Sequence, residues 1–239
     1  MAETSNMLGP IDYELWLLTI LMEVAGLVCL FKAKAFTRHF TIPLYICSCL
    51  AVDIGRYIIL SASGYDSGAY FYFYYYSEFL ITIALYFVLM GMYSHAFSDM
   101  GVSKYLRGGA MLLLGGTACV SYRMVAASAD RLITHFVIEL SSNLYFVGVV
   151  LTYILWGAMM KLRSNRTREM QLVLSLGVYF SALAASYALE SMYPGSMLWR
   201  YVSHLMTIWL PLSWAYTFLK VPEEARLATS SVVAPNPSR

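Results

Sequence analysis

Several ionisable side chains of this 239-residue chain lie inside long apolar segments. A charged side chain within a membrane span costs roughly 2.5–3.5 kcal/mol on insertion scales, so such residues are rare unless they pair or line a polar space. The candidates for one shared pocket are Glu23, Asp53, Arg56, Glu78, Glu139, Asn143 and His204. Counted along helices at ~1.5 Å per residue, nearly all of them fall in the outer half of the predicted spans. The sequence therefore predicts a polar pocket that opens to the outside.

The charges of these residues indicate what the pocket would bind. Asp53 and Arg56 are three residues apart on one helix and can pair, and Arg56 can instead form a buried ion pair with Glu78. Once Arg56 is paired, carboxyl groups remain in excess, so either some are protonated or a cation binds there. Neighbouring tyrosines can add cation–π attraction. An amine, a metal ion or a proton is favoured over an anion, and internal pairing without any ligand is the alternative.

A metal site is a further hypothesis. His135 and Glu139 are one helical turn apart, a spacing that allows two side chains to share a metal ion. Glu190 and His204 are expected near the same outer face and could complete the ligand set. The sequence contains no HExxH motif, no phosphate-binding loop and no serine hydrolase elbow.

The four histidines also fit a haem hypothesis. His135 and His204 lie near the outer face, whereas His39 and His95 lie near the inner face, so two bis-histidine haems could conduct electrons across the membrane. At the inner face, solvated histidines at loop edges are the alternative. A retinal Schiff base requires a lysine within a span, and every lysine here is expected at an inner edge.

The composition indicates that these residues are carried by membrane helices. The chain is 59% hydrophobic and only 13% charged, with a mean hydropathy of +0.62, whereas soluble domains carry roughly 25% charged residues. Because backbone polar groups in lipid must be satisfied within their own segment, each span should be a helix of ~20 residues. The predicted fold is an all-α bundle of seven transmembrane helices in residues 1–219, followed by a short disordered tail, 220–239. The predicted spans are 14–31, 41–61, 70–92, 105–121, 132–159, 170–191 and 199–219.

Lysine and arginine residues set the predicted orientation. Twelve of them fall in the first, third and fifth loops and the C-terminal tail, whereas only Arg123, Arg131 and Arg200 fall on the other side. The positive-inside rule therefore predicts an outer N-terminus and a cytoplasmic C-terminus. We expect a multi-pass protein integral to the cell (inner) membrane. The net charge of +2 is too small to indicate binding of nucleic acid.

Aromatic and small residues refine this arrangement. The segment 70–92 begins with a run of tyrosines and phenylalanines that fits the outer interface. Small residues repeat every four positions at Gly177, Ser181 and Ala185, and glycines recur seven apart in 105–121. Such rows allow helices to approach closely, either within the bundle or in a homo-oligomer formed through the fourth and sixth helices. Pro211 is expected to kink the last helix.

Two resemblances concern topology. FTIPLYICSCLAVDIGRYIIL followed by YFYFYYYSEFLITIALYFVL resembles the second and third helices of small uncharacterised bacterial seven-helix membrane proteins, which implies the same fold but no activity. Trp209-Leu210-Pro211 resembles the Trp-x-Pro motif of heptahelical receptors, although here it lies on the last helix and the other receptor motifs are absent.

Three functional hypotheses follow. The first is a non-enzymatic protein that binds or senses a small ligand or cation in the outer pocket, together with a separate cytoplasmic or membrane protein partner. The second is a haem- or metal-containing redox protein. The third is a structural or assembly subunit of a membrane complex.

Overall fold

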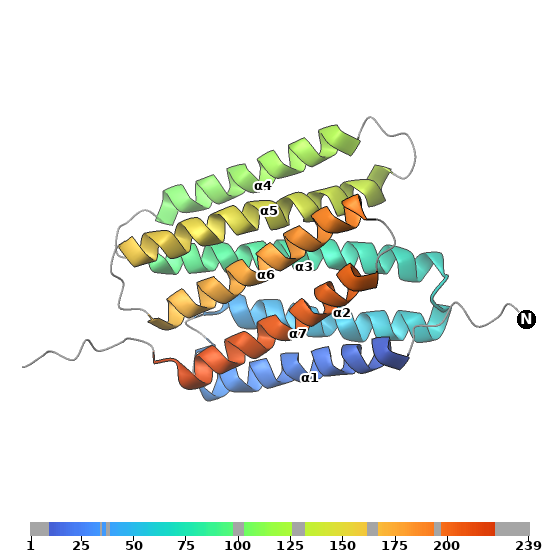
Figure 1. Ribbon diagram of the computed structural model, residues 1–239, viewed down its shortest axis with the longest axis horizontal. Helices are drawn as coiled ribbons and strands as arrows, with labels where there is room; N and C mark the ends of the chain where they lie inside the picture. Colours follow the sequence, from blue (N-terminus) through green and yellow to red (C-terminus); the bar gives the residue numbers. More distant parts are fainter. Residues whose placement is uncertain are drawn as a thin grey trace, which may run out of the picture.

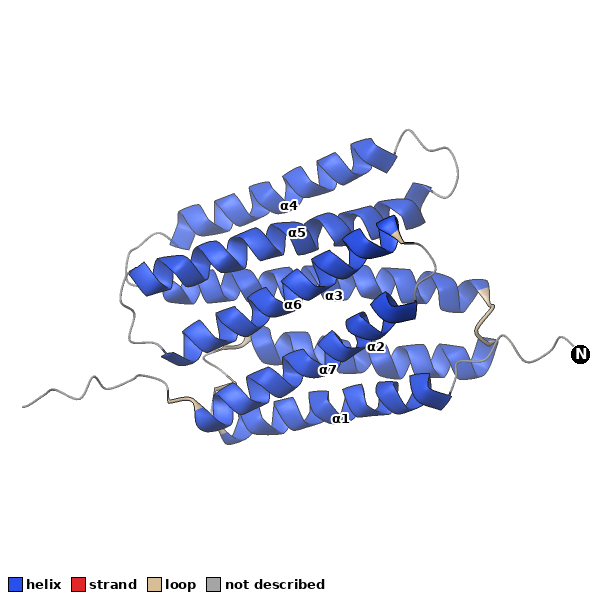
Figure 2. Cartoon of the chain, viewed as in Figure 1, coloured by secondary structure: helices blue, strands red, loops and turns tan. Residues whose placement is uncertain are grey.

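The computed structural model describes residues 10–33, 35–36, 39–97, 103–125, 132–161, 167–193 and 197–222, which form seven α-helices and no strand (Figures 1 and 2). The helices are α1 (Pro10–Lys32), α2 (Thr41–Ser63), α3 (Gly68–Ala96), α4 (Ser103–Val125), α5 (Leu132–Lys161), α6 (Thr167–Met192) and α7 (Met197–Lys220). Each predicted span lies within one helix, so the all-α prediction is confirmed for the described part of the chain. Residues 223–239 of the predicted tail lie outside it.

Five of the described helices, α1, α2, α3, α5 and α6, are long and apolar enough to cross a bilayer. They indicate an integral, multi-pass membrane protein. Helices α4 and α7 are not among the five. Helix α7 carries many Trp, Tyr, Ser and Thr side chains of low hydropathy.

Six helices form a closed ring, and α4 lies outside it. Around the ring, α1 contacts α2, α2 contacts α3, α3 contacts α5, α5 contacts α6, α6 contacts α7, and α7 returns to α1. Helix α4 packs mainly on α5, at the edge of the bundle in Figure 1. Successive helices run in opposite directions, so the bundle has two distinct ends. We call one the basic end, because α1, α5 and α7 finish there at Lys32, Lys161 and Lys220, and the other the amino-terminal end.

The apolar core fills the half of the ring nearer the basic end. Its most buried members include Leu30, Ile42, Leu89, Leu155, Leu172, Trp214 and Phe218. They come from the last turns of α1, α3, α5 and α7 and the first turns of α2 and α6. Polar lining residues are concentrated in the other half, so the core closes the ring on one side only.

Glycines mark the closest helix contacts. A Cβ atom on Gly55 of α2 would lie 2.7 Å from the ring of Phe73 on α3. In the small-residue row of α6, a Cβ atom on Gly177 would lie 3.3 Å from Thr152 Oγ1 of α5, and Ser181 Oγ lies 3.3 Å from the hydroxyl of Tyr153 on the same helix, whereas Ala185 is exposed. The first two positions of that row thus pack on α5 of the same chain. By contrast, a Cβ atom on any of the four α4 glycines, Gly108, Gly109, Gly115 and Gly116, would have no described neighbour within 4 Å.

The start of α3 is fixed by a side-chain cap. Ser67 is extended (φ −75°, ψ 139°), and its Oγ accepts a hydrogen bond of 3.1 Å from the backbone N–H of Tyr70. Losing such a cap costs about 1 kcal/mol. We expect Ser67→Ala to lower the free energy of unfolding in mixed micelles by about that amount. Ser61→Ala is the control, because Ser61 Oγ only donates to a carbonyl of its own helix. Equal stability of the two variants would contradict the cap.

Candidate functional site

A cavity of about 1150 Å³ occupies the ring on the amino-terminal side of the core. All six ring helices contribute to its lining, whereas α4 does not. Toward the core, the lining includes Tyr45 and Cys49 in the first half of α2 and Pro211 near the middle of α7. Exposed residues such as Tyr65, Asp66 and Glu190 lie at its other side, so the cavity opens at the amino-terminal end.

The structure brings five of the seven predicted pocket residues to this cavity. They are Glu23 of α1, Asp53 and Arg56 of α2, Glu78 of α3 and His204 of α7. The residues come from four helices and from distant parts of the sequence, and they line one continuous space.

The other two predicted pocket residues, Glu139 and Asn143, do not line it. Asn143 Nδ2 donates to Ser121 Oγ of α4 at 3.0 Å and to Glu139 Oε1 at 3.3 Å. The helix period explains this placement. Asn143 is two residues from the cavity-lining Tyr145, about 200° around α5, and therefore points away from the cavity. These polar groups join α5 to α4 instead.

The Arg56 side chain in the cavity lining contacts two carboxylate groups, a hydroxyl group and an aromatic ring. Its Nη2 donates to Glu78 Oε2 at 3.1 Å, and its Nη1 lies 3.9 Å from Asp53 Oδ1. Ser77 Oγ accepts from Nε and Nη2 at 3.2 and 3.1 Å, and the guanidinium carbon lies 4.5 Å from the ring centroid of Tyr74. Both internal pairings considered from the sequence are therefore present, and the pair of Arg56 with Glu78 joins α2 to α3.

The second oxygen of Glu78 is held by α5. The hydroxyl of Tyr145 donates to Glu78 Oε1 at 3.3 Å and lies 3.1 Å from Thr82 Oγ1. Thr82 Oγ1 in turn donates to the backbone carbonyl of Glu78 at 2.9 Å. With Arg56 on one oxygen and Tyr145 on the other, the Glu78 carboxylate is fixed in orientation by three helices.

Glu23 differs from Glu78 in the hydrogen bonding of its carboxyl group. Its side chain is only 4% exposed and lines the cavity, yet its Oε2 has no hydrogen-bond partner among the described residues. Buried carboxyl oxygens are normally satisfied, because an unpaired one carries the full cost of desolvation. The Glu23 carboxyl group can therefore accept a hydrogen bond from a molecule inside the cavity.

Aromatic side chains form much of the rest of the lining. The lining includes Trp16, Phe71 and nine tyrosines, at positions 45, 65, 70, 72, 74, 75, 145, 179 and 187.

Comparisons with protein-family models, curated proteins and solved structures find no match. The chemistry of the cavity follows from its own side chains, which combine carboxyl groups with the faces of aromatic rings. Only the tyrosines of residues 70–76 had a visible signal in the sequence, as an interfacial aromatic run.

The predicted metal-binding residues are not brought together among the described side chains. Glu190 and His204 line the cavity, whereas Glu139 lies at the contact of α5 with α4. The side chain of His135 is outside the described part, and so is the haem pair that it would form with His204. The second pair of predicted haem ligands is His39 and His95, whose rings are edge to face with centroids 5.1 Å apart. A haem does not fit between imidazoles in that arrangement, since axial ligands approach the iron from opposite faces.

Proposed function

We propose that this protein is a seven-span membrane protein that binds a small organic cation, with an amine as its polar group, in the cavity at its amino-terminal end. The observation that carries the proposal is the buried Glu23 carboxyl group, whose Oε2 has no partner among the described residues. An ammonium group can donate to that oxygen and can also lie over the faces of nearby aromatic rings.

The charges of the lining support a cation over an anion. Arg56 already contacts two carboxylates, so its charge is compensated by Asp53 and Glu78. Glu23 Oε2 then remains without a hydrogen-bond donor among the described residues. A volume of about 1150 Å³ is ample for a small-molecule ligand, because such pockets usually measure roughly 300–1,000 Å³.

We further propose that the amino-terminal end faces outward and that the C-terminus is cytoplasmic. The lysines that close α1, α5 and α7 support this orientation through the positive-inside rule. Helices α4 and α7, with 23 and 24 residues, match the length of the five more apolar helices beside which they run. Seven crossings and an outward-facing cavity then follow.

Ligand binding can be tested with the purified full-length chain in detergent. The probes are methylammonium, n-butylammonium and phenethylammonium, and the readout is the fluorescence of Trp16, which lines the cavity. We expect at least one of these cations to bind and Glu23→Gln to weaken that binding about tenfold or more, because the variant loses the charge that faces the ammonium group. Acetate serves as the anionic control and should not bind.

Glu14→Gln is the matched control variant, because Glu14 lies on the same helix but is exposed and does not line the cavity. It should bind the probes as the wild type does. Absence of binding by all three cations, or equal affinities of Glu23→Gln and Glu14→Gln, would contradict the proposal.

A further inference from the structure

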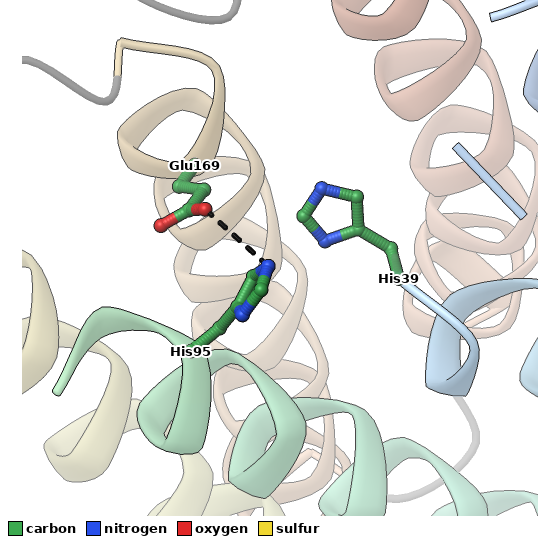
Figure 3. Close-up of side chains that lie close together, drawn as sticks. All are labelled: His39, His95 and Glu169. Atoms are coloured by element: carbon green, nitrogen blue, oxygen red, sulfur yellow. Dashed lines mark ion pairs between the residues drawn. The ribbon is translucent and has the colours of Figure 1, made fainter. Parts of the chain in front are cut away.

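A second group of polar side chains lies at the basic end, on the other side of the apolar core from the cavity. His39 precedes α2, His95 is in the last turn of α3, and Glu169 is in the first turn of α6. One nitrogen from each histidine and one carboxylate oxygen lie within 4.8 Å of one another. Figure 3 shows the three side chains converging from three separate segments. His95 Nε2 and Glu169 Oε1 are 3.8 Å apart.

We propose that His39, His95 and Glu169 bind one divalent transition-metal ion, with Zn²⁺ as the best match. Two imidazole nitrogens and one carboxylate oxygen are a ligand set that zinc uses with a fourth position left open. The nitrogen donors disfavour Mg²⁺ and Ca²⁺, which take oxygen ligands.

The spacing of the donors suits such an ion after small side-chain rotations. Bonds of about 2.0–2.1 Å in a tetrahedral site hold donor atoms about 3.3 Å apart. The separation of 3.8 Å between His95 and Glu169 is close to that value. All three side chains are half-buried, so they are partly shielded from water yet accessible to an ion.

The surroundings orient the ligands and leave room for the fourth one. The ring of His39 lies edge to face with Phe218 of α7, with centroids 5.8 Å apart. Arg168, next to Glu169, donates from Nε to the carbonyl oxygen of Val221 at 3.0 Å, which ties this cation to the end of α7. A cleft of about 300 Å³ adjoins both histidines and also includes Thr41 and Ser94, so a water molecule or a small anion can reach the open position.

Metal binding at this place would join the segment before α2 to α3 and α6. An ion that binds only the folded state stabilises it by an amount that rises with the logarithm of the free ion concentration once this exceeds the dissociation constant. The inferred site would therefore hold the basic end of the ring together, independently of any ligand in the cavity.

The test uses the full-length chain, freed of any affinity tag and stripped of metal with a chelator. Co²⁺ is titrated first, because cobalt bound by imidazole and carboxylate shows visible absorption bands, and Zn²⁺ is then added to displace it. We expect one Co²⁺ per chain, displacement by one Zn²⁺, and a higher thermal unfolding temperature with Zn²⁺ than without. His39→Ala and His95→Ala should each weaken Co²⁺ binding at least tenfold, and Glu169→Gln should do the same while keeping the side chain's shape.

His204→Ala is the matched histidine control and should keep one Co²⁺ per chain. A circular dichroism spectrum with unchanged helix content establishes that each variant is folded, and the Glu169→Gln result stands if an alanine variant does not fold. The proposal is overturned if the wild type shows no Co²⁺ bands and no bound Zn²⁺, which would leave only an ion pair between His95 and Glu169. It is also overturned if metal binding survives in all three site variants or is lost in His204→Ala.

Discussion

Replacing Arg56 with methionine should lower the free energy of unfolding by about 3 kcal/mol. The guanidinium group contacts Glu78 at 3.1 Å and Asp53 at 3.9 Å, and the side chain is only 15% exposed. Removing one member of a buried ion pair leaves the other charge without compensation, which costs about 3–5 kcal/mol. The lower end of that range applies, because Glu78 is partly accessible from the cavity. Unfolding by SDS in mixed micelles, followed by circular dichroism, measures the change.

Two further variants isolate the charge effect. Arg123→Met also removes an arginine, but Arg123 is exposed near the end of α4, so a change within about 0.5 kcal/mol is expected. The double variant Arg56→Met with Glu78→Gln should recover most of the lost stability, since both charges of the closest pair are then absent. If Arg56→Met were as stable as Arg123→Met, the ion pairs would have no structural role.

The helices and much of the cavity could be predicted from the sequence for a simple physical reason. A backbone in lipid must be helical, so apolar length alone locates the spans. Ionisable side chains inside those spans stand out against an apolar background, and their distance from the helix ends gives their depth. Glu23, Asp53, Arg56, Glu78 and His204 were identified on that basis, and they share one cavity.

Depth alone did not reveal which way each side chain faces. Glu139 and Asn143 lie at a suitable depth, but α5 has polar groups on two sides, one toward the cavity and the other toward Ser121 of α4. Choosing between these sides requires knowing that α4 lies outside the ring and packs on α5. This helix order results from tertiary packing and leaves no periodic signal in one sequence.

The proximity of His39, His95 and Glu169 at the basic end could not be predicted either, because it also depends on how the helices pack. His39 and His95 are both at helix ends, where solvated side chains are common, and Glu169 begins a helix far away in the sequence. Their proximity depends on α3 and α6 approaching each other across the ring. The small residues of α6 were recognised as a contact surface, but the sequence could not show that Gly177 and Ser181 contact α5 of the same chain.

A second large effect is expected at the contact between α5 and α6. A Cβ atom on Gly148 would lie 2.7 Å from two ring carbons of Phe180 and 2.9 Å from Cγ, and Phe180 is only 2% exposed. Because Cγ is near the base of the side chain, the ring cannot move aside without a change at χ1 or a shift of the helix. We expect Gly148→Val to destabilise the protein by about 3 kcal/mol, the upper part of the usual range for overpacking. The same SDS unfolding experiment measures it.

Gly157→Val provides the matched control on the same helix. A Cβ atom on Gly157 has no described neighbour within 4 Å, so the added side chain meets no protein atom and stability should change by about 0.5 kcal/mol or less. The two substitutions are chemically identical and carry the same intrinsic cost in a helix. Any difference between them therefore reports the packing of α5 against α6.

A double-mutant cycle separates crowding from other causes of instability. Phe180→Ala alone should destabilise the protein, because it leaves a cavity in the core. In combination with Gly148→Val, however, valine would occupy part of the space that the ring vacates. The two free-energy losses should therefore sum to more than the loss of the double variant, by about 1 kcal/mol or more. Strict additivity would mean that Gly148 and Phe180 do not contact each other and that α5 and α6 pack through a different pair of surfaces.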